Sequence, residues 1–64
     1  MNASDIIKLA EKHHTNNSSA WYCLSDARKC LERGEEEYAK KRALNSLLYS
    51  VGMFHPDYIK ASKP

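Results

Sequence analysis

The chain has 64 residues, which is enough for one domain with one small hydrophobic core. Its ten basic and eight acidic side chains are interspersed and give a net charge of +2, too weak a bias to indicate a nucleic-acid-binding tail. No apolar run approaches the roughly 18 residues of a membrane span, and the N-terminus has neither the basic start nor the apolar stretch of a signal peptide. We therefore expect a cytoplasmic protein with no membrane partner.

Residues 3 to about 14 are predicted to form a short amphipathic helix, because apolar positions recur at three- and four-residue spacing. These positions are Ile6, Leu9, Ala10 and His13. Asn2 or Ser4 can act as the N-cap, and Asp5 places a negative charge in the first turn.

A polar run, residues 15–19, separates this helix from a second one, predicted from Asn17 or Ser18 to Arg33. The apolar residues of the second helix fall within one arc at about 100° per residue. They are Ala20, Cys23, Leu24, Ala27, Cys30 and Leu31. Gly34 is expected to end the helix, because a residue without Cβ adopts the left-handed C′ conformation at little cost.

A third helix is predicted over residues 35–51, which open with three glutamates at the positive end of the helix dipole and end before Gly52. Its strongest apolar face is Ala43, Leu44, Leu47, Leu48 and Val51. A neighbouring stripe of small residues, Ala39, Ser46 and Ser50, can face the small residues of the second helix. The two helices are therefore predicted to form a closely packed antiparallel hairpin.

Residues 53–64 form an apolar and aromatic tail that we expect to be docked, with Pro56 suited to the first position of a last helical turn. The predicted fold class is all-α: a single domain over residues 1–64, with a short helix, an antiparallel helical hairpin and a short C-terminal turn or helix. We expect a homodimer, because the core is small and the third helix is apolar or aromatic over most of its circumference.

An interaction surface is predicted on the third helix, where four residues are spaced four, three and four apart. They are Tyr38, Arg42, Asn45 and Tyr49. Tyrosine and arginine dominate interface energetics, and Trp21, Phe54 and Tyr58 are further candidates. The alternative is that the two tyrosines pack against the first helix or the tail of the same chain. The sequence thus predicts a non-enzymatic interaction or regulatory module with an unidentified protein partner.

A small DNA-binding regulator is the alternative function. It would use a basic surface made of Arg28, Lys29, Arg33, Lys40 and Lys41. We favour a second interpretation of these charges, in which they form intrahelical ion pairs with acidic residues three or four positions away. The expected pairs are Glu36–Lys40, Glu37–Lys41, Asp26–Lys29 and Arg28–Glu32.

No cofactor, metal site or catalytic group is predicted. Cys23 and Cys30 are seven residues apart in one helix, so their Cα atoms would lie about 10 Å apart, beyond the reach of a disulfide. Together with His13, His14 and His55 they include possible zinc ligands, but the sequence has no CxxC or HxxxH spacing. A thiol- or metal-dependent switch at the two cysteines is the least favoured function. No Gly-rich phosphate loop is present, and no spacing suggests an orienting group for a Cys/His pair.

The segment 20–51 resembles a single helix pair of the tetratricopeptide type, with small residues Ala27, Ala39 and Ser46 at the crossing and Gly34 at the turn. This resemblance implies the hairpin geometry. In its length and in the run of residues 18–60, the chain also resembles the very small helical accessory proteins of the early, recombination-to-excision region of lambdoid bacteriophages. That resemblance implies an early phage protein in the bacterial cytoplasm that binds a host or phage protein and influences phage development.

Overall fold

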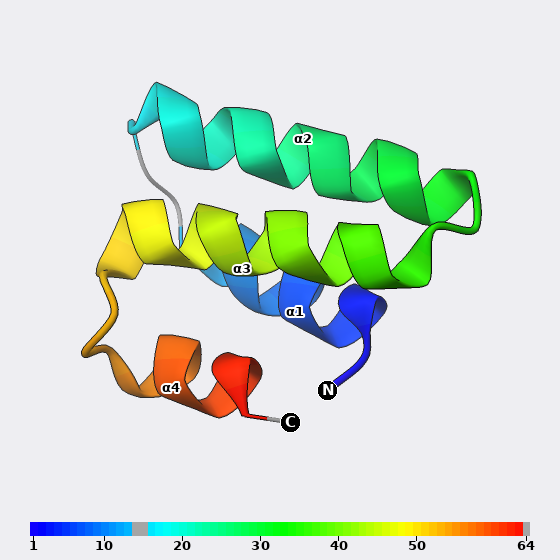
Figure 1. Ribbon diagram of the computed structural model, residues 1–64. Helices are drawn as coiled ribbons and strands as arrows, with labels where there is room; N and C mark the ends of the chain where they lie inside the picture. The colour runs from blue at the N-terminus through cyan, green and yellow to red at the C-terminus, as the bar shows by residue number, and fades with distance from the viewer. Residues whose placement is uncertain (14–15, 64) are drawn as a thin grey trace.

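The computed structural model describes residues 1–13 and 16–63, and over these residues it confirms the all-α fold class. The helices are α1 (Ala3–Lys12), α2 (Ser18–Glu32), α3 (Glu36–Val51) and α4 (Pro56–Ser62), as Figure 1 shows. Their bounds agree with the predictions to within a residue, except that α1 ends at Lys12 with His13 as its C-cap. His14, to which the prediction extended that helix, lies outside the described residues. None of the described helices is both long and apolar enough to cross a membrane.

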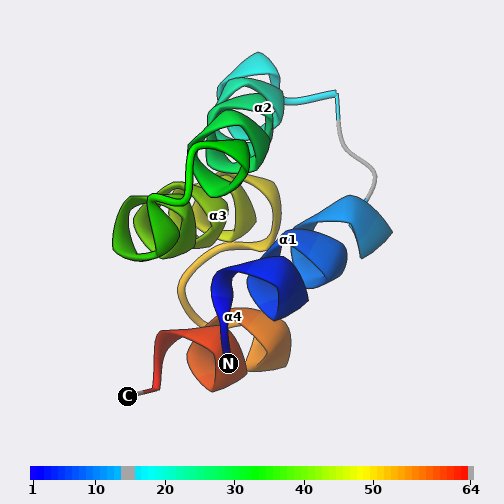
Figure 2. The same cartoon turned by 90° about the vertical axis from the view of Figure 1, so that its right-hand side faces the viewer.

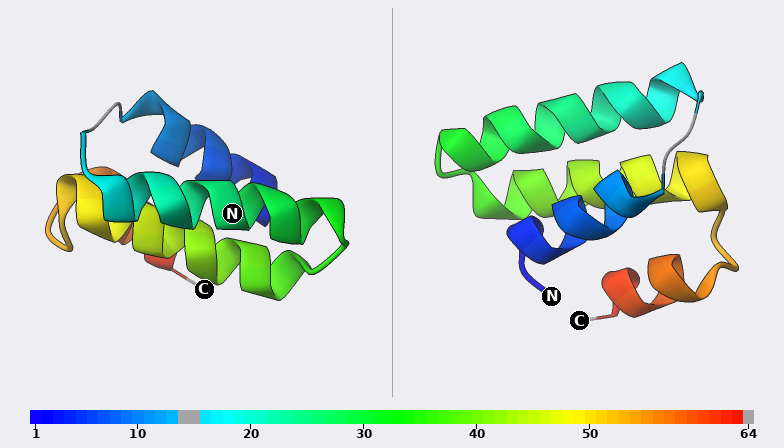
Figure 3. Two further views of the ribbon diagram at one scale, coloured as in Figure 1. Left: turned by 90° about the horizontal axis from the view of Figure 1, so that it is seen from above. Right: turned by 180° about the vertical axis from the view of Figure 1, so that it is seen from behind.

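Helix α3 is the centre of the molecule, since it packs against each of the other three helices. It runs antiparallel to α2 along nearly its whole length (Figures 1 and 3). Seen along the hairpin, α1 and α2 lie on different sides of α3, and α4 lies below it (Figure 2). The predicted hairpin and the central position of the third helix are therefore confirmed.

The hairpin turn is a Schellman motif built on Gly34. Gly34 has φ +76°, its N–H donates to Leu31 O at 3.0 Å, and the N–H of Glu35 donates to Cys30 O at 2.9 Å. Gly52 ends α3 with φ 90° and ψ 166°, a region of backbone space that only glycine adopts readily. Both helix ends predicted from glycine are confirmed.

Local hydrogen bonds begin the first two helices. Asn2 and Asp5 form a capping box at the start of α1, and the Asn17 side chain accepts from two backbone N–H groups of α2. A contact from outside the helix adds to the first cap, since the N–H of Ala3 donates to the Glu36 carboxylate at 2.6 Å. Glu36, expected to pair with Lys40 in its own helix, thus fixes the start of α1 against α3.

The core is narrow because α2 and α3 meet through small side chains. The Ser46 hydroxyl donates to Ala20 O at 2.7 Å across the interface, and Cys30 packs with Ala39 and Ala3. Ile6 and Leu47 are the largest fully buried side chains of the described residues. The rest of the main core comes from all four helices: Ile7, Ala10, Leu24, Ala27, Ala43 and Ala61.

Two expectations for the core were wrong. Ile7, left out of the predicted face of the first helix, is buried, because α1 packs against both α2 and α3 and so buries a wider arc. Leu48, assigned to the apolar face of the third helix, is 37% exposed. The close contact with α2 turns the small-residue stripe of α3 inward, and Leu48 is left near the surface.

Leu47→Ala should lower the free energy of unfolding by about 2–5 kcal/mol, because Leu47 is 0% exposed and its removal leaves a cavity beside Ile6. In a domain this small that loss is a large part of the total stability. Leu48→Ala, one position along the same helix, should cost about 1 kcal/mol or less. Urea unfolding followed by circular dichroism measures both variants, and equal losses would contradict this assignment of the core.

Candidate functional site

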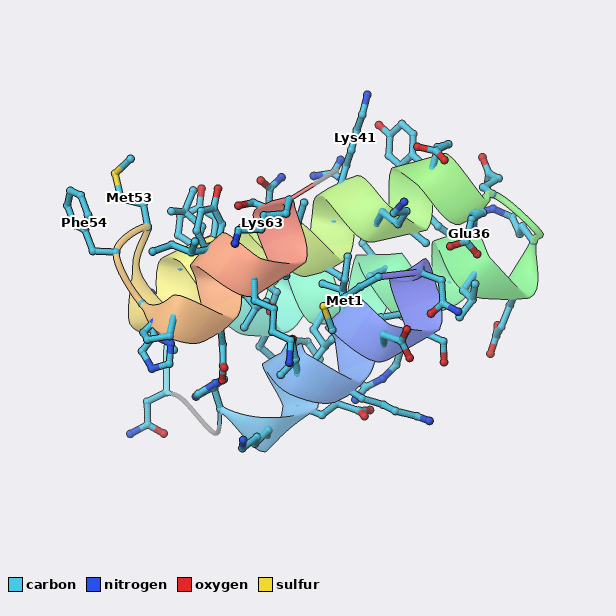
Figure 4. The ribbon with its side chains drawn as sticks, turned by 90° about the horizontal axis from the view of Figure 1, so that it is seen from below. Met1, Glu36, Lys41, Met53, Phe54 and Lys63 are labelled. Carbon is cyan, nitrogen blue, oxygen red and sulfur yellow. The ribbon has the colours of Figure 1, made fainter. Side chains whose placement is uncertain are left out.

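The most exposed large hydrophobic side chain of the described residues, Phe54, lies at the turn between α3 and α4 beside the exposed Met53. Phe54 is 85% exposed and Met53 is 59% exposed, and Figure 4 shows both projecting outward from that turn. Leu48 and Tyr49 at the end of α3 and Ile59 of α4 are also exposed. We call these five residues the C-terminal apolar surface.

The predicted stripe on α3 lies on the outside of the hairpin. Tyr38 and Tyr49 are each 52% exposed, so neither tyrosine is buried in the core. The Arg42 guanidinium carbon lies 5.4 Å from the centre of the Tyr38 ring, in cation–π range, and Arg42 Nε lies 3.7 Å from the Asp26 carboxylate. These contacts hold the stripe in place on α3. Asn45, the remaining member, is exposed.

Trp21 is exposed at the edge of a groove of about 310 Å³ lined by residues of α1, α2 and α3. Leu24 and Ala10 line the groove, and the Glu11–Arg28 ion pair borders it. The Trp21 and Tyr22 rings make an edge contact with centres 6.4 Å apart. Trp21 is thus a surface residue beside a groove that is open to solvent.

Tyr58, a predicted interface residue, is partly buried and packs against the core of its own chain. Together with the buried Ala61 it docks α4 on α3. The tail, residues 53–64, is therefore docked only in part. Its helix α4 packs on α3, as expected, whereas Met53 and Phe54 at its start are exposed.

Two of the five residues of the predicted basic surface, both arginines, form ion pairs. Arg28 pairs with Glu11 of α1, and Arg33 pairs with Glu35. The Glu35 carboxylate hydrogen-bonds Arg33 and raises the pKa of its guanidinium. Lys29 and Lys41 are exposed, on α2 and α3, and Lys40 is half-buried.

The ion pairs among the described residues also differ from those expected. None of the four predicted intrahelical pairs forms; Arg28 and Asp26 instead pair with Glu11 and Arg42 of neighbouring helices. The helices pack closely enough for these carboxylates to reach arginines across an interface. The pairs therefore join helices rather than stabilise single ones.

A cluster of two histidines and an aspartate joins the end of α1 to the start of α4. His13 Nε2 lies 2.6 Å from Asp57 Oδ2, and the centres of the His13 and His55 rings are 5.0 Å apart in an edge contact. His55 is the N-cap of α4, where its Nδ1 accepts from the N–H of Asp57 at 3.1 Å. All three side chains are half-buried.

The hydrogen bond from His13 lowers the pKa of the Asp57 carboxyl from its ordinary value of 3.8, and the nearby Lys12 lowers it further. The side chains offer three metal-ligand atoms within 4.8 Å of one another, one from each residue. The sequence offered His13 and His55 as possible zinc ligands but not Asp57, and it could not place the three together, because they come from distant parts of the chain and no short spacing motif connects them.

The cysteines lie within the hairpin. Cys30 is buried against Ala39, and its Sγ accepts from Arg33 Nη2 at 3.4 Å, whereas Cys23 is half-buried. Both thiols are free. Cys30 fills space in the α2–α3 interface, where free cysteine behaves as a compact apolar residue.

Comparison of the chain with protein-family models, with curated proteins and with solved structures finds no match. The resemblances to a tetratricopeptide helix pair and to phage accessory proteins stay predictions.

Stability should fall in acid, in part through Asp57. The pKa of Asp57 is lowered in the folded chain, so the unfolded chain binds a proton at this carboxyl more readily. The contribution of ionised Asp57 to the free energy of unfolding is therefore complete above about pH 5 and is lost as the pH falls through the folded pKa. Asp57→Asn should therefore lower the melting temperature at neutral pH and make little difference at about pH 2. Thermal melting of both proteins in a chelator checks this, and a gap that is independent of pH would contradict it.

Proposed function

We propose that this chain is a non-enzymatic protein-interaction module that forms a homodimer through the C-terminal apolar surface. The observation that carries the proposal is the exposure of Phe54 and Met53 side by side on a projecting turn. An exposed phenylalanine side chain adds no hydrophobic stabilisation, whereas its full burial in an interface contributes roughly 1.5–3 kcal/mol to the free energy of association. Contiguous exposed apolar side chains are typical of interaction sites.

A second copy of the chain is the occupant that best accounts for the rest of the molecule. The core is filled largely by alanines, so each chain has little stability to spare, and association supplies more. In a two-fold dimer, each favourable contact occurs twice. The five exposed apolar residues of this surface come from one stretch of chain, residues 48–59.

The dimer would leave two other surfaces for a different protein. The Tyr38–Arg42 contact lies at the opposite end of α3 from the turn that carries Phe54, and the groove beside Trp21 is lined by residues of α1, α2 and α3, none of which belongs to the C-terminal apolar surface. Both contain the aromatic and arginine side chains that dominate protein interfaces. An adaptor that dimerises through one end and binds a partner through another fits this arrangement.

Light scattering across a dilution series tests the dimer. The unmodified chain should have twice its monomer mass at high concentration and lose mass on dilution. Phe54→Ser should raise the dimer dissociation constant at least a hundredfold, since two buried rings of about 1.5–3 kcal/mol each are lost. The helicity of the monomer should be unchanged, because the ring touches no core residue.

Tyr22→Ser is the matched control, since it removes another exposed aromatic ring, 69% exposed, from α2 and should leave the dissociation constant unchanged. A monomer at all concentrations, or a dimer weakened by the Tyr22 variant and not by the Phe54 variant, would refute the proposed interface.

A further inference from the structure

The cluster of His13, His55 and Asp57 has the composition of a transition-metal site. Two imidazoles and a carboxylate are the ligand types that zinc prefers, whereas magnesium and calcium favour sites made of oxygen alone. The three ligand atoms lie within 4.8 Å of one another, and all three residues are half-buried at helix ends, where an ion can reach them.

The spacing is close to that of a tetrahedral centre. Zinc–ligand bonds of about 2.0–2.1 Å place neighbouring ligand atoms about 3.3 Å apart. The hydrogen bond between His13 Nε2 and Asp57 Oδ2, 2.6 Å long, must therefore open by about 0.7 Å, and the His55 nitrogen must move inward. Side-chain rotation at the two helix ends is sufficient for shifts of this size.

Metal binding replaces two hydrogen bonds with metal bonds. The Asp57 carboxylate accepts a hydrogen bond from His13 Nε2, so the His13 ring proton must move from Nε2 to Nδ1 before Nε2 can bind the ion. His55 Nδ1 now accepts from the N–H of Asp57, which fixes the ring proton on Nε2. Coordination through Nδ1 uses the lone pair that accepts this bond, and coordination through Nε2 moves the proton to Nδ1. Either route releases the N-cap bond of α4, and the N–H of Asp57 then turns to water.

We propose that His13, His55 and Asp57 bind Zn²⁺ and that the ion fastens α4 to the end of α1. Three protein ligands leave the fourth position of a tetrahedral centre for a water molecule. The bound ion would act as a cross-link that stabilises the folded chain, as structural metals do in other small domains. The site is independent of the proposed dimer, because Phe54 and Met53 contribute no ligand atom.

The charge around the site sets its strength. Lys12, the last residue of α1, directly precedes His13, so its positive charge opposes a cation bound at the site. Removal of that charge should therefore tighten zinc binding.

Titration calorimetry of the full chain with Zn²⁺ at about pH 7.5 tests the site, with thermal melting in zinc as a second readout. One equivalent should bind per chain and raise the melting temperature with zinc concentration, as for any ligand that prefers the folded state. His55→Asn keeps a good N-cap residue and removes the imidazole, and should weaken binding at least tenfold. Asp57→Asn should do the same, and Lys12→Gln should strengthen it.

A Cys23→Ala/Cys30→Ala variant separates this site from thiol coordination and should bind zinc as the unmodified chain does. Three results would overturn the proposal: no heat and no change in melting with zinc, unchanged affinity in the His55 and Asp57 variants, or loss of binding in the double cysteine variant. Circular dichroism without metal checks that each variant is folded. The higher zinc affinity expected of Lys12→Gln cannot result from unfolding of the variant.

Discussion

The close approach of α2 and α3 is the constraint on which the rest of the molecule depends. Small side chains line both helices, and the Ser46 hydroxyl crosses the interface to the carbonyl of Ala20. Alanine and serine allow two backbones to approach in a way that leucine does not. The Schellman turn at Gly34 fits this geometry, because it reverses the chain within a few residues.

That close packing leaves the hairpin short of large buried side chains, and α1 supplies them. Ile6 and Ile7 of α1 lie in one buried cluster with Leu24 of α2 and Leu47 of α3. The contact between the Glu36 carboxylate and the N–H of Ala3 fixes the same helix at its other end. Helix α1 therefore contributes to the core, although it is shorter than either helix of the hairpin.

The close packing of α2 and α3 also leaves large apolar side chains on the surface. With the small-residue stripe of α3 turned inward, Leu48 and Tyr49 lie outward, and Met53 and Phe54 of the following turn are exposed as well. Helix α4 covers part of α3 through Tyr58 and Ala61, and the His13–Asp57 contact ties it to α1. The same contact brings together two of the three residues of the proposed zinc site.

Features that depend on residues near one another in the chain were predicted from the sequence. The sequence offered Asn2 or Ser4 and Asn17 or Ser18 as N-caps, and the caps are Asn2 and Asn17. The stops at Gly34 and Gly52 and Pro56 at the first position of α4 are likewise decided by backbone geometry within a few residues. Helix periodicity predicted the hairpin and placed Tyr38 and Tyr49 on one stripe of α3, with packing inside the chain left as the alternative.

Only the tertiary structure decided which residues meet across helices. The burial of Ile7, the exposure of Leu48 and the pairing of Arg28 with Glu11 depend on the crossing of the helices, and so does the meeting of His13 with Asp57. Periodicity specifies the face of a helix on which a residue lies, but the distance between residues on different helices is set by how closely those faces pack. In this chain the small side chains between α2 and α3 set that distance.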